Sequence, residues 1–92
     1  MARRRPVSGL GSLTPGAVRL LDYLAAERGR LWVRRWVAAG DCMMCDRSAF
    51  RAVKGLSMFG LVEVEHRDRI VWIRATPLGI ELMAARYRTE AA

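Results

Sequence analysis

Two cysteines separated by two methionines, Cys42 and Cys45, have a spacing used for metal binding and for redox chemistry. The spacing brings two sulfur atoms within reach of one zinc ion or of each other. Zinc needs four ligands, and the chain leaves only His66, Asp41 and Asp46 as further donors. We therefore expect no metal and no cofactor, and we expect the pair to pack a turn. A redox role is the alternative.

Cationic side chains at helical spacing are the second feature with chemical meaning. Phe50, Val53 and Leu56 keep the spacing of the buried face of a helix, which Gly60 would end. If these three face a core, the opposite face carries a hydroxyl group and three cations at offsets of one, four and seven residues: Arg47, Ser48, Arg51 and Lys54.

This polar face has the chemistry of a nucleic-acid contact. Arginine binds both acceptors of guanine in the major groove, so we expect Arg47 and Arg51 to contact bases. Ser48 and Lys54 would hold phosphates. The alternative is an amphipathic helix whose polar face is merely solvated.

The charge balance also favours a polyanionic partner. Lys and Arg number 16 against nine Asp and Glu, a net charge of +7, and most of the cations are arginine. The planar guanidinium group suits phosphates and base edges. The alternative is the codon bias of a GC-rich genome, with charge serving only solubility.

The sequence lacks the motifs that would indicate an enzyme or a membrane protein. The sequence contains no Ser/His/Asp set, no paired catalytic carboxylates and no Gly-rich phosphate loop, so we expect no enzyme and no small-molecule substrate. No apolar run reaches the roughly 20 residues of a membrane span, and the basic start lacks the apolar stretch of a signal peptide. We expect a cytoplasmic protein of a bacterium, or of a phage or plasmid within one.

Local signals divide the first half of the chain into short elements. Thr14-Pro15 is an N-cap followed by proline, and predicts a helix that begins there and ends at Gly29. The β-favouring triplet 31–33 predicts a tiny strand. Residues 34–39 follow as a short helix, with Trp36 in the core.

The second half changes its hydrophobic period. Asp46 or Ser48 would cap the third helix. From Leu61 onward the period becomes two, which predicts a β-hairpin over residues 62–73 that ends at Ala75. Thr76-Pro77 then repeats the cap and proline of a helix start.

Two motifs resemble winged helix-turn-helix regulators of the MarR and PadR type. The stretch 48–62, SAFRAVKGLSMFGLV, is similar to their recognition helix, which ends in Leu, three residues and Gly-Leu-Val. The stretch 75–82, ATPLGIEL, is similar to the Thr-Pro-x-Gly start of the helix after their wing. The resemblance implies an α+β, mostly helical winged helix-turn-helix fold, with a three-helix core, a two-stranded hairpin wing and a C-terminal helix.

The same resemblance implies where DNA would bind. The helix from Arg47 to Gly60 would enter the major groove, and the second helix would cross the backbone. The wing would reach phosphates or the minor groove, with His66 as a possible helper. Because Asp68 weakens the field at the tip, a solvated turn is the alternative. The implied further contacts are Arg34 and Arg35 on the second helix, and Arg67 and Arg69 on the wing.

The first residues are basic. Arg3, Arg4 and Arg5 would form a minor-groove arm, or simply a disordered terminus. We accordingly expect a flexible arm over residues 1–13, a DNA-binding domain over 14–88 and a tail over 89–92.

The resulting hypothesis is a sequence-specific transcriptional regulator, a repressor, that binds double-stranded DNA as a homodimer. The exposed ends of the first and last helices would form the dimer interface through Tyr23, Leu82, Met83 and Tyr87. The alternatives are a winged-helix protein-interaction adaptor and an architectural or excisionase-like DNA-bending factor.

Overall fold

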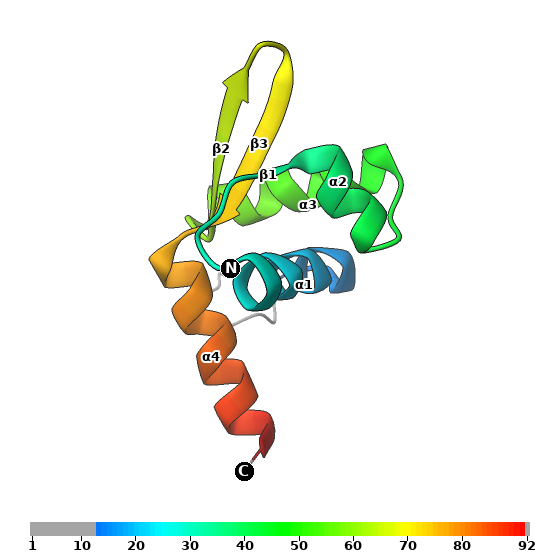
Figure 1. Cartoon of the computed structure of the whole chain (residues 1–92). Coiled ribbons are helices and arrows are strands. Elements are labelled where there is room, and N and C mark those ends of the chain that lie inside the picture. The colour runs from blue at the N-terminus through cyan, green and yellow to red at the C-terminus, as the bar shows by residue number, and fades with distance from the viewer. Residues whose placement is uncertain (1–12, 92) are drawn as a thin grey trace, which may run out of the picture.

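The computed structural model describes residues 13–91, and helices make up most of this part of the chain (Figure 1). A long β-hairpin projects beyond the helices at one end, and the last helix extends toward the other end (Figure 1). The elements in chain order are α1 Pro15–Asp22, η1 Tyr23–Arg28, β1 Val33–Arg34, α2 Arg35–Asp41, α3 Asp46–Met58, β2 Val62–Arg67, β3 Ile70–Ala75 and α4 Pro77–Ala91. The predicted mostly helical α+β architecture is confirmed.

The first helix begins and ends where the sequence predicts. The backbone N–H of Ala17 donates to Thr14 Oγ1 at 3.1 Å, and Pro15 occupies the first turn, where its missing N–H has no cost. Gly29 ends the helical stretch with a φ of +60°, a conformation that glycine tolerates best. The sequence did not indicate that the second half, η1, is a π-helix.

The short strand begins two residues later than predicted and ends one residue later. β1 pairs with β3 in antiparallel register, Val33 with Ile73 and Arg34 with Trp72, and thereby adds a third strand to the hairpin in the order β1-β3-β2. The prediction that Trp36 lies in the core is wrong, because its side chain is 61% exposed. Helix α2 buries the small side chains of Ala38 and Ala39 instead, which leaves its first turn at the surface.

Helix α3 buries Val53 and Leu56 as predicted, but its buried face is rotated away from Phe50. Its buried residues are Ala49, Ala52, Val53 and Leu56. Phe50, which we expected to face inward, is 54% exposed. At 100° per residue the centre of the buried face lies about 110° from Phe50, so this ring falls outside the core.

The start of α3 also differs from the prediction. The N-cap residue is Cys45 rather than Asp46 or Ser48, and Asp46 stands in the first turn, where a carboxylate interacts favourably with the helix dipole.

The core lies among α1, η1, α3 and the base of the sheet. Its largest fully buried side chains are Leu20, Leu21 and Leu24 on the first helical stretch, Leu56 on α3 and Ile73 on β3. The helical spacing of the first three, the buried face of α3 and the inward face of β3 account for one continuous apolar cluster.

One close junction fixes the end of α3 to the start of α4. Thr76 Oγ1 donates to the carbonyl oxygen of Gly60 at 2.8 Å and accepts from the N–H of Gly79 at 3.0 Å. A Cβ at Gly79 would lie 2.3 Å from the carbonyl oxygen of Leu61, a distance that no side chain permits. The Thr-Pro-x-Gly motif is therefore a cap, a proline and a close approach in succession.

The hairpin closes with two residues, Asp68 and Arg69, which have φ values of +49° and +68°. Positive φ at both central positions is the geometry of a two-residue turn that matches the twist of the strands. The paired residues Arg67 and Ile70 flank this turn, so the register places Arg67 and Arg69 at or beside the tip, as predicted.

Candidate nucleic-acid interface

The exposed face of α3 is cationic. Arg47, Arg51 and Lys54 are all exposed and, at 100° per residue, lie within about 60° of one another on the side opposite the buried residues. In the part of the chain that the structure describes, no carboxylate lies within ion-pair distance of any of the three. The three charges therefore face solvent without internal neutralisation.

Ser48 is exposed at the start of the same helix. Its hydroxyl oxygen accepts from the thiol of Cys45 at 3.4 Å. The hydroxyl proton stays available for another acceptor.

Phe50 joins these polar side chains on the surface of α3. The guanidinium carbon of Arg35, at the start of α2, lies 5.7 Å from the centre of the ring. Between α3 and the hairpin is a hollow of about 230 Å³ with an apolar lining of Phe50, Val53, Val64 and Val71, bordered by Arg35, Lys54, Ser57 and His66. The periodicity of the sequence placed Phe50 inside, so this feature was missed.

The face of the sheet turned away from α3 carries alternating arginine and tryptophan side chains, here called the Arg/Trp stack: Arg34, Trp72, Arg67, Trp32 and Arg74. The guanidinium of Arg34 lies 5.3 Å from a ring centre of Trp72, and that of Arg67 lies 4.8 Å from Trp72 and 5.5 Å from Trp32. Arg74 lies 4.3 Å from the Trp32 ring. These are cation–π distances.

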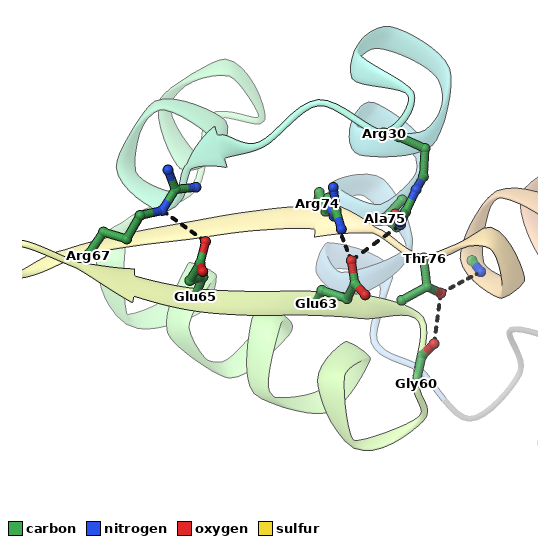
Figure 2. A network of polar contacts seen from close by, with 9 residues as sticks. Arg30, Gly60, Glu63, Glu65, Arg67, Arg74, Ala75 and Thr76 are labelled. Carbon is green, nitrogen blue, oxygen red and sulfur yellow. Dashed lines mark hydrogen bonds and ion pairs between the residues drawn. The ribbon is translucent and has the colours of Figure 1, made fainter.

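Two glutamates neutralise part of the stack, as Figure 2 shows. Glu65 pairs with Arg67 at 2.8 Å. Glu63 pairs with Arg74 and, at 3.3 Å, with Arg30. The hydrogen bond from Arg74 lowers the pKa of the Glu63 carboxyl group below its usual value. Arg30 and Arg74 thus hold the base of the sheet together, and Arg67 is already partly neutralised.

The other predicted contacts fall into two groups. Arg34 and Arg35 stand at the junction of β1 and α2, and Arg69 is exposed in the hairpin turn; none of them has an ion-pair partner within residues 13–91. Arg3, Arg4 and Arg5 lie outside the described residues.

The two cysteines have different environments. Cys42 is buried in the core, as a packing role predicts, and burial raises the pKa of its thiol. Cys45 is exposed, contrary to that prediction, and the Ser48 hydroxyl and backbone N–H groups at the start of α3 lower the pKa of its thiol. Both are free thiols. Within the described residues, no three His, Cys, Asp or Glu side chains gather as a metal site would require.

Part of the predicted dimer surface is buried inside the chain. Met83 is 3% exposed and belongs to the core, so it cannot be the exposed contact we expected. The Tyr23 hydroxyl donates to Asp41 and accepts from Arg28, and the Tyr87 hydroxyl donates to Asp22. Leu82 is half-buried.

No helix between residues 13 and 91 has the length and apolar character needed to cross a membrane.

The order of helices, the turn between α2 and α3, and the hairpin that follows define a winged helix-turn-helix domain. No protein-family model and no curated protein sequence matches the chain. Solved structures of MarR-type transcriptional regulators, however, have the same winged-helix fold.

Three of these structures illustrate the similarity. A MarR-family transcriptional regulator from Silicibacter pomeroyi has a TM-score of 0.73 and 23% identity over 83% of this chain and 51% of its own. MepR of Staphylococcus aureus, solved in complex with DNA, has a TM-score of 0.70 and 20% identity over 83% and 63%. PcaV of Streptomyces coelicolor, solved with its natural ligand, has a TM-score of 0.70 and 17% identity over 87% and 60%. The chain spans between half and two thirds of the length of these regulators.

Proposed function

We propose that this protein binds double-stranded DNA as a transcriptional regulator, with α3 in the major groove and the hairpin wing against the backbone. The observation that carries the proposal is the row of Arg47, Arg51 and Lys54, exposed on α3 without a carboxylate partner among the described residues. Positive charges that stay unpaired on a rigid helix favour the binding of a polyanion. An α-helix is also the element that fits the major groove.

The remaining cations support the same orientation. Arg34 and Arg35 would donate to phosphates from the start of α2, which crosses the backbone in a helix-turn-helix. Arg69 would reach the backbone or the minor groove from the wing. Arg67 would contribute less because Glu65 already pairs with it. Ser48 would add a phosphate contact, and Arg3, Arg4 and Arg5 remain proposed as a minor-groove arm.

A homodimer on a palindromic site is part of the proposal. One recognition helix reads too few bases for tight specificity, and two-fold pairing doubles the number. Half-sites about one helical turn, roughly 34 Å, apart would match two copies of α3. The proposal includes repression as the outcome and the cytoplasm as the location, because there the protein would meet its operator.

Selection of bound duplexes from a random pool tests this function. We expect enrichment of two half-sites about one helical turn apart. Arg51→Ala should weaken binding to the enriched site by about 5-fold to 150-fold and relax the preference at one position, as loss of a bidentate guanine contact does.

The matched control is Arg88→Ala, which removes the same charge from the exposed last turn of α4. Equal binding by Arg51→Ala and wild type, or no preference for any duplex sequence, would contradict the proposal. Weak enrichment together with strong bending of bound DNA would instead favour an architectural factor, and no binding to duplex DNA would favour an adaptor.

A further inference from the structure

An aromatic ring stands exposed on the proposed recognition helix. Phe50 is 54% exposed, although Ala49, Ala52, Val53 and Leu56 of the same helix are buried. Its position has no role in filling the core, because the small side chains of Ala49 and Ala52 already occupy the face that packs inward. An exposed phenyl group costs solvation free energy, which contact with another apolar group would recover.

The surroundings of Phe50 indicate what kind of group that is. The ring follows Arg47 by three residues and precedes Lys54 by four, so it is a neighbour of both on the helix surface. The Arg35 guanidinium lies 5.7 Å from the ring centre, which adds a third cation. An apolar group set among cations suits a partner that presents apolar atoms within a field of negative charge.

DNA presents such a group in the major groove. The 5-methyl of thymine lies at the floor of that groove between two rows of phosphates, and it is the one apolar group among the base edges there. Residues in the N-terminal half of a recognition helix contact base edges, and Phe50 is the fifth of the 13 residues of α3.

We infer that Phe50 is a specificity-determining residue that contacts the 5-methyl group of a thymine in each half-site. The inference rests on the proposed function and adds a thymine preference to the guanine contacts of the neighbouring arginines. A protein without this ring would keep its cations, and therefore its general affinity for DNA, but would lose the distinction between thymine and uracil at that position.

Removal of the methyl group from the DNA tests the contact directly. In the selected duplex, each thymine is replaced in turn by deoxyuridine, and dissociation constants are measured by fluorescence anisotropy. For the wild type, one position in each half-site should lose about fourfold in affinity, the factor that corresponds to burial of one methyl group. For Phe50→Ala, the same replacement should change affinity by less than about 1.5-fold. Phe50→Leu, which keeps an apolar side chain, should retain part of the sensitivity.

The matched control is Leu78→Ala, which removes an apolar side chain of nearly equal exposure, 53%, from α4. It should respond to deoxyuridine as the wild type does. Melting temperatures of the variants show that each is folded.

Each outcome has one meaning. A loss at the same position that is equal in the wild type and Phe50→Ala overturns the inference, and so does a loss at no position. Phe50→Ala that weakens all duplexes uniformly assigns the ring to the sugar-phosphate backbone, and unchanged affinity shows that the ring does not contact DNA. Both outcomes overturn the inference while the proposed function stands. Failure of the wild type to bind any duplex removes the proposed function itself.

Discussion

Replacement of Lys54 by alanine should make DNA binding less sensitive to salt. Lys54 is exposed on α3, and no carboxylate of residues 13–91 lies within ion-pair distance of it. Each phosphate that a cation neutralises contributes about 0.9 to the slope of log affinity against log salt concentration, because condensed counterions are released. The variant should therefore have a slope smaller by about 0.9 for each subunit that contacts DNA.

The number of unpaired cations also predicts the salt slope of the wild-type protein. Six cations assigned to the proposed interface have no ion-pair partner within the described residues: Arg34, Arg35, Arg47, Arg51, Lys54 and Arg69. If all six contact phosphates, the slope is about 5 for one chain; arginines that contact bases lower this value. A fourfold rise in salt should reduce the advantage of the wild type over Lys54→Ala by about 3.5-fold for each subunit.

Fluorescence anisotropy with a labelled duplex at four or five salt concentrations measures both slopes. Arg88→Ala is again the control, since it changes net charge by the same amount outside the proposed interface. Identical slopes for the wild type and Lys54→Ala would refute the assignment of Lys54 to a phosphate. Equal reductions in the two variants would show that net charge, rather than position, governs the salt effect.

Three further predictions concern the fold and its titratable groups. Gly79→Ala should lower the free energy of unfolding by about 2 kcal/mol, because the new methyl group collides with a backbone carbonyl, whereas Gly55→Ala meets open space and should raise it by up to about 1 kcal/mol. Urea unfolding followed by circular dichroism measures both, and effects of the same sign would contradict the reasoning. Glu63→Gln should lower the melting temperature at neutral pH. A carboxyl group whose pKa falls on folding stabilises the protein fully above its ordinary pKa of 4.5, and this stabilisation is lost as pH falls through the lower folded value. The difference in melting temperature between Glu63→Gln and the wild type should therefore disappear in acid. A difference that is constant with pH would contradict this. Iodoacetamide should alkylate Cys45 well before Cys42, since the first thiol is exposed with a lowered pKa and the second is buried with a raised one. Mass spectrometry reports the order, Cys45→Ser is the control, and simultaneous modification would refute the assignment.

Local signals predicted the element boundaries best. Thr14 and Thr76 each cap a helix through a hydroxyl that accepts a backbone N–H three residues later, and this geometry depends on neighbouring residues alone. The hairpin followed from its hydrophobic period of two, which also depends on neighbouring residues alone. These features need no knowledge of the rest of the fold.

The buried face of α3 was harder to predict because small side chains of this helix are buried while a large apolar one is exposed. The helical spacing predicted that Phe50 is buried, whereas the structure exposes Phe50 and buries the small side chain of Ala52 instead. Small residues let helices approach closely, and a phenyl group at the same place would hold them apart. The four polar residues of the predicted site nevertheless remained exposed, since they lie far enough from the buried face to tolerate its rotation.

The Arg/Trp stack was missed for a different reason. It depends on which residues of three strands lie side by side, and the register that aligns Arg34, Trp72 and Glu65 involves a strand of two residues far away in the chain. The common parity of Glu63, Glu65 and Arg67 on β2 was a usable signal, because alternate residues share one face of a strand. It indicated a charged face but not the tryptophans that would meet it.

The stacking of Arg34 on Trp72 and of Arg35 beside Phe50 has a consequence for the thermodynamics of association. A free arginine surrenders about 2 kcal/mol of rotamer entropy when a ligand immobilises it. A guanidinium group that already rests on a ring has given up part of that freedom before any encounter. Lysine at either position would bring the same charge, but its unrestrained chain would have to be ordered at the moment of contact.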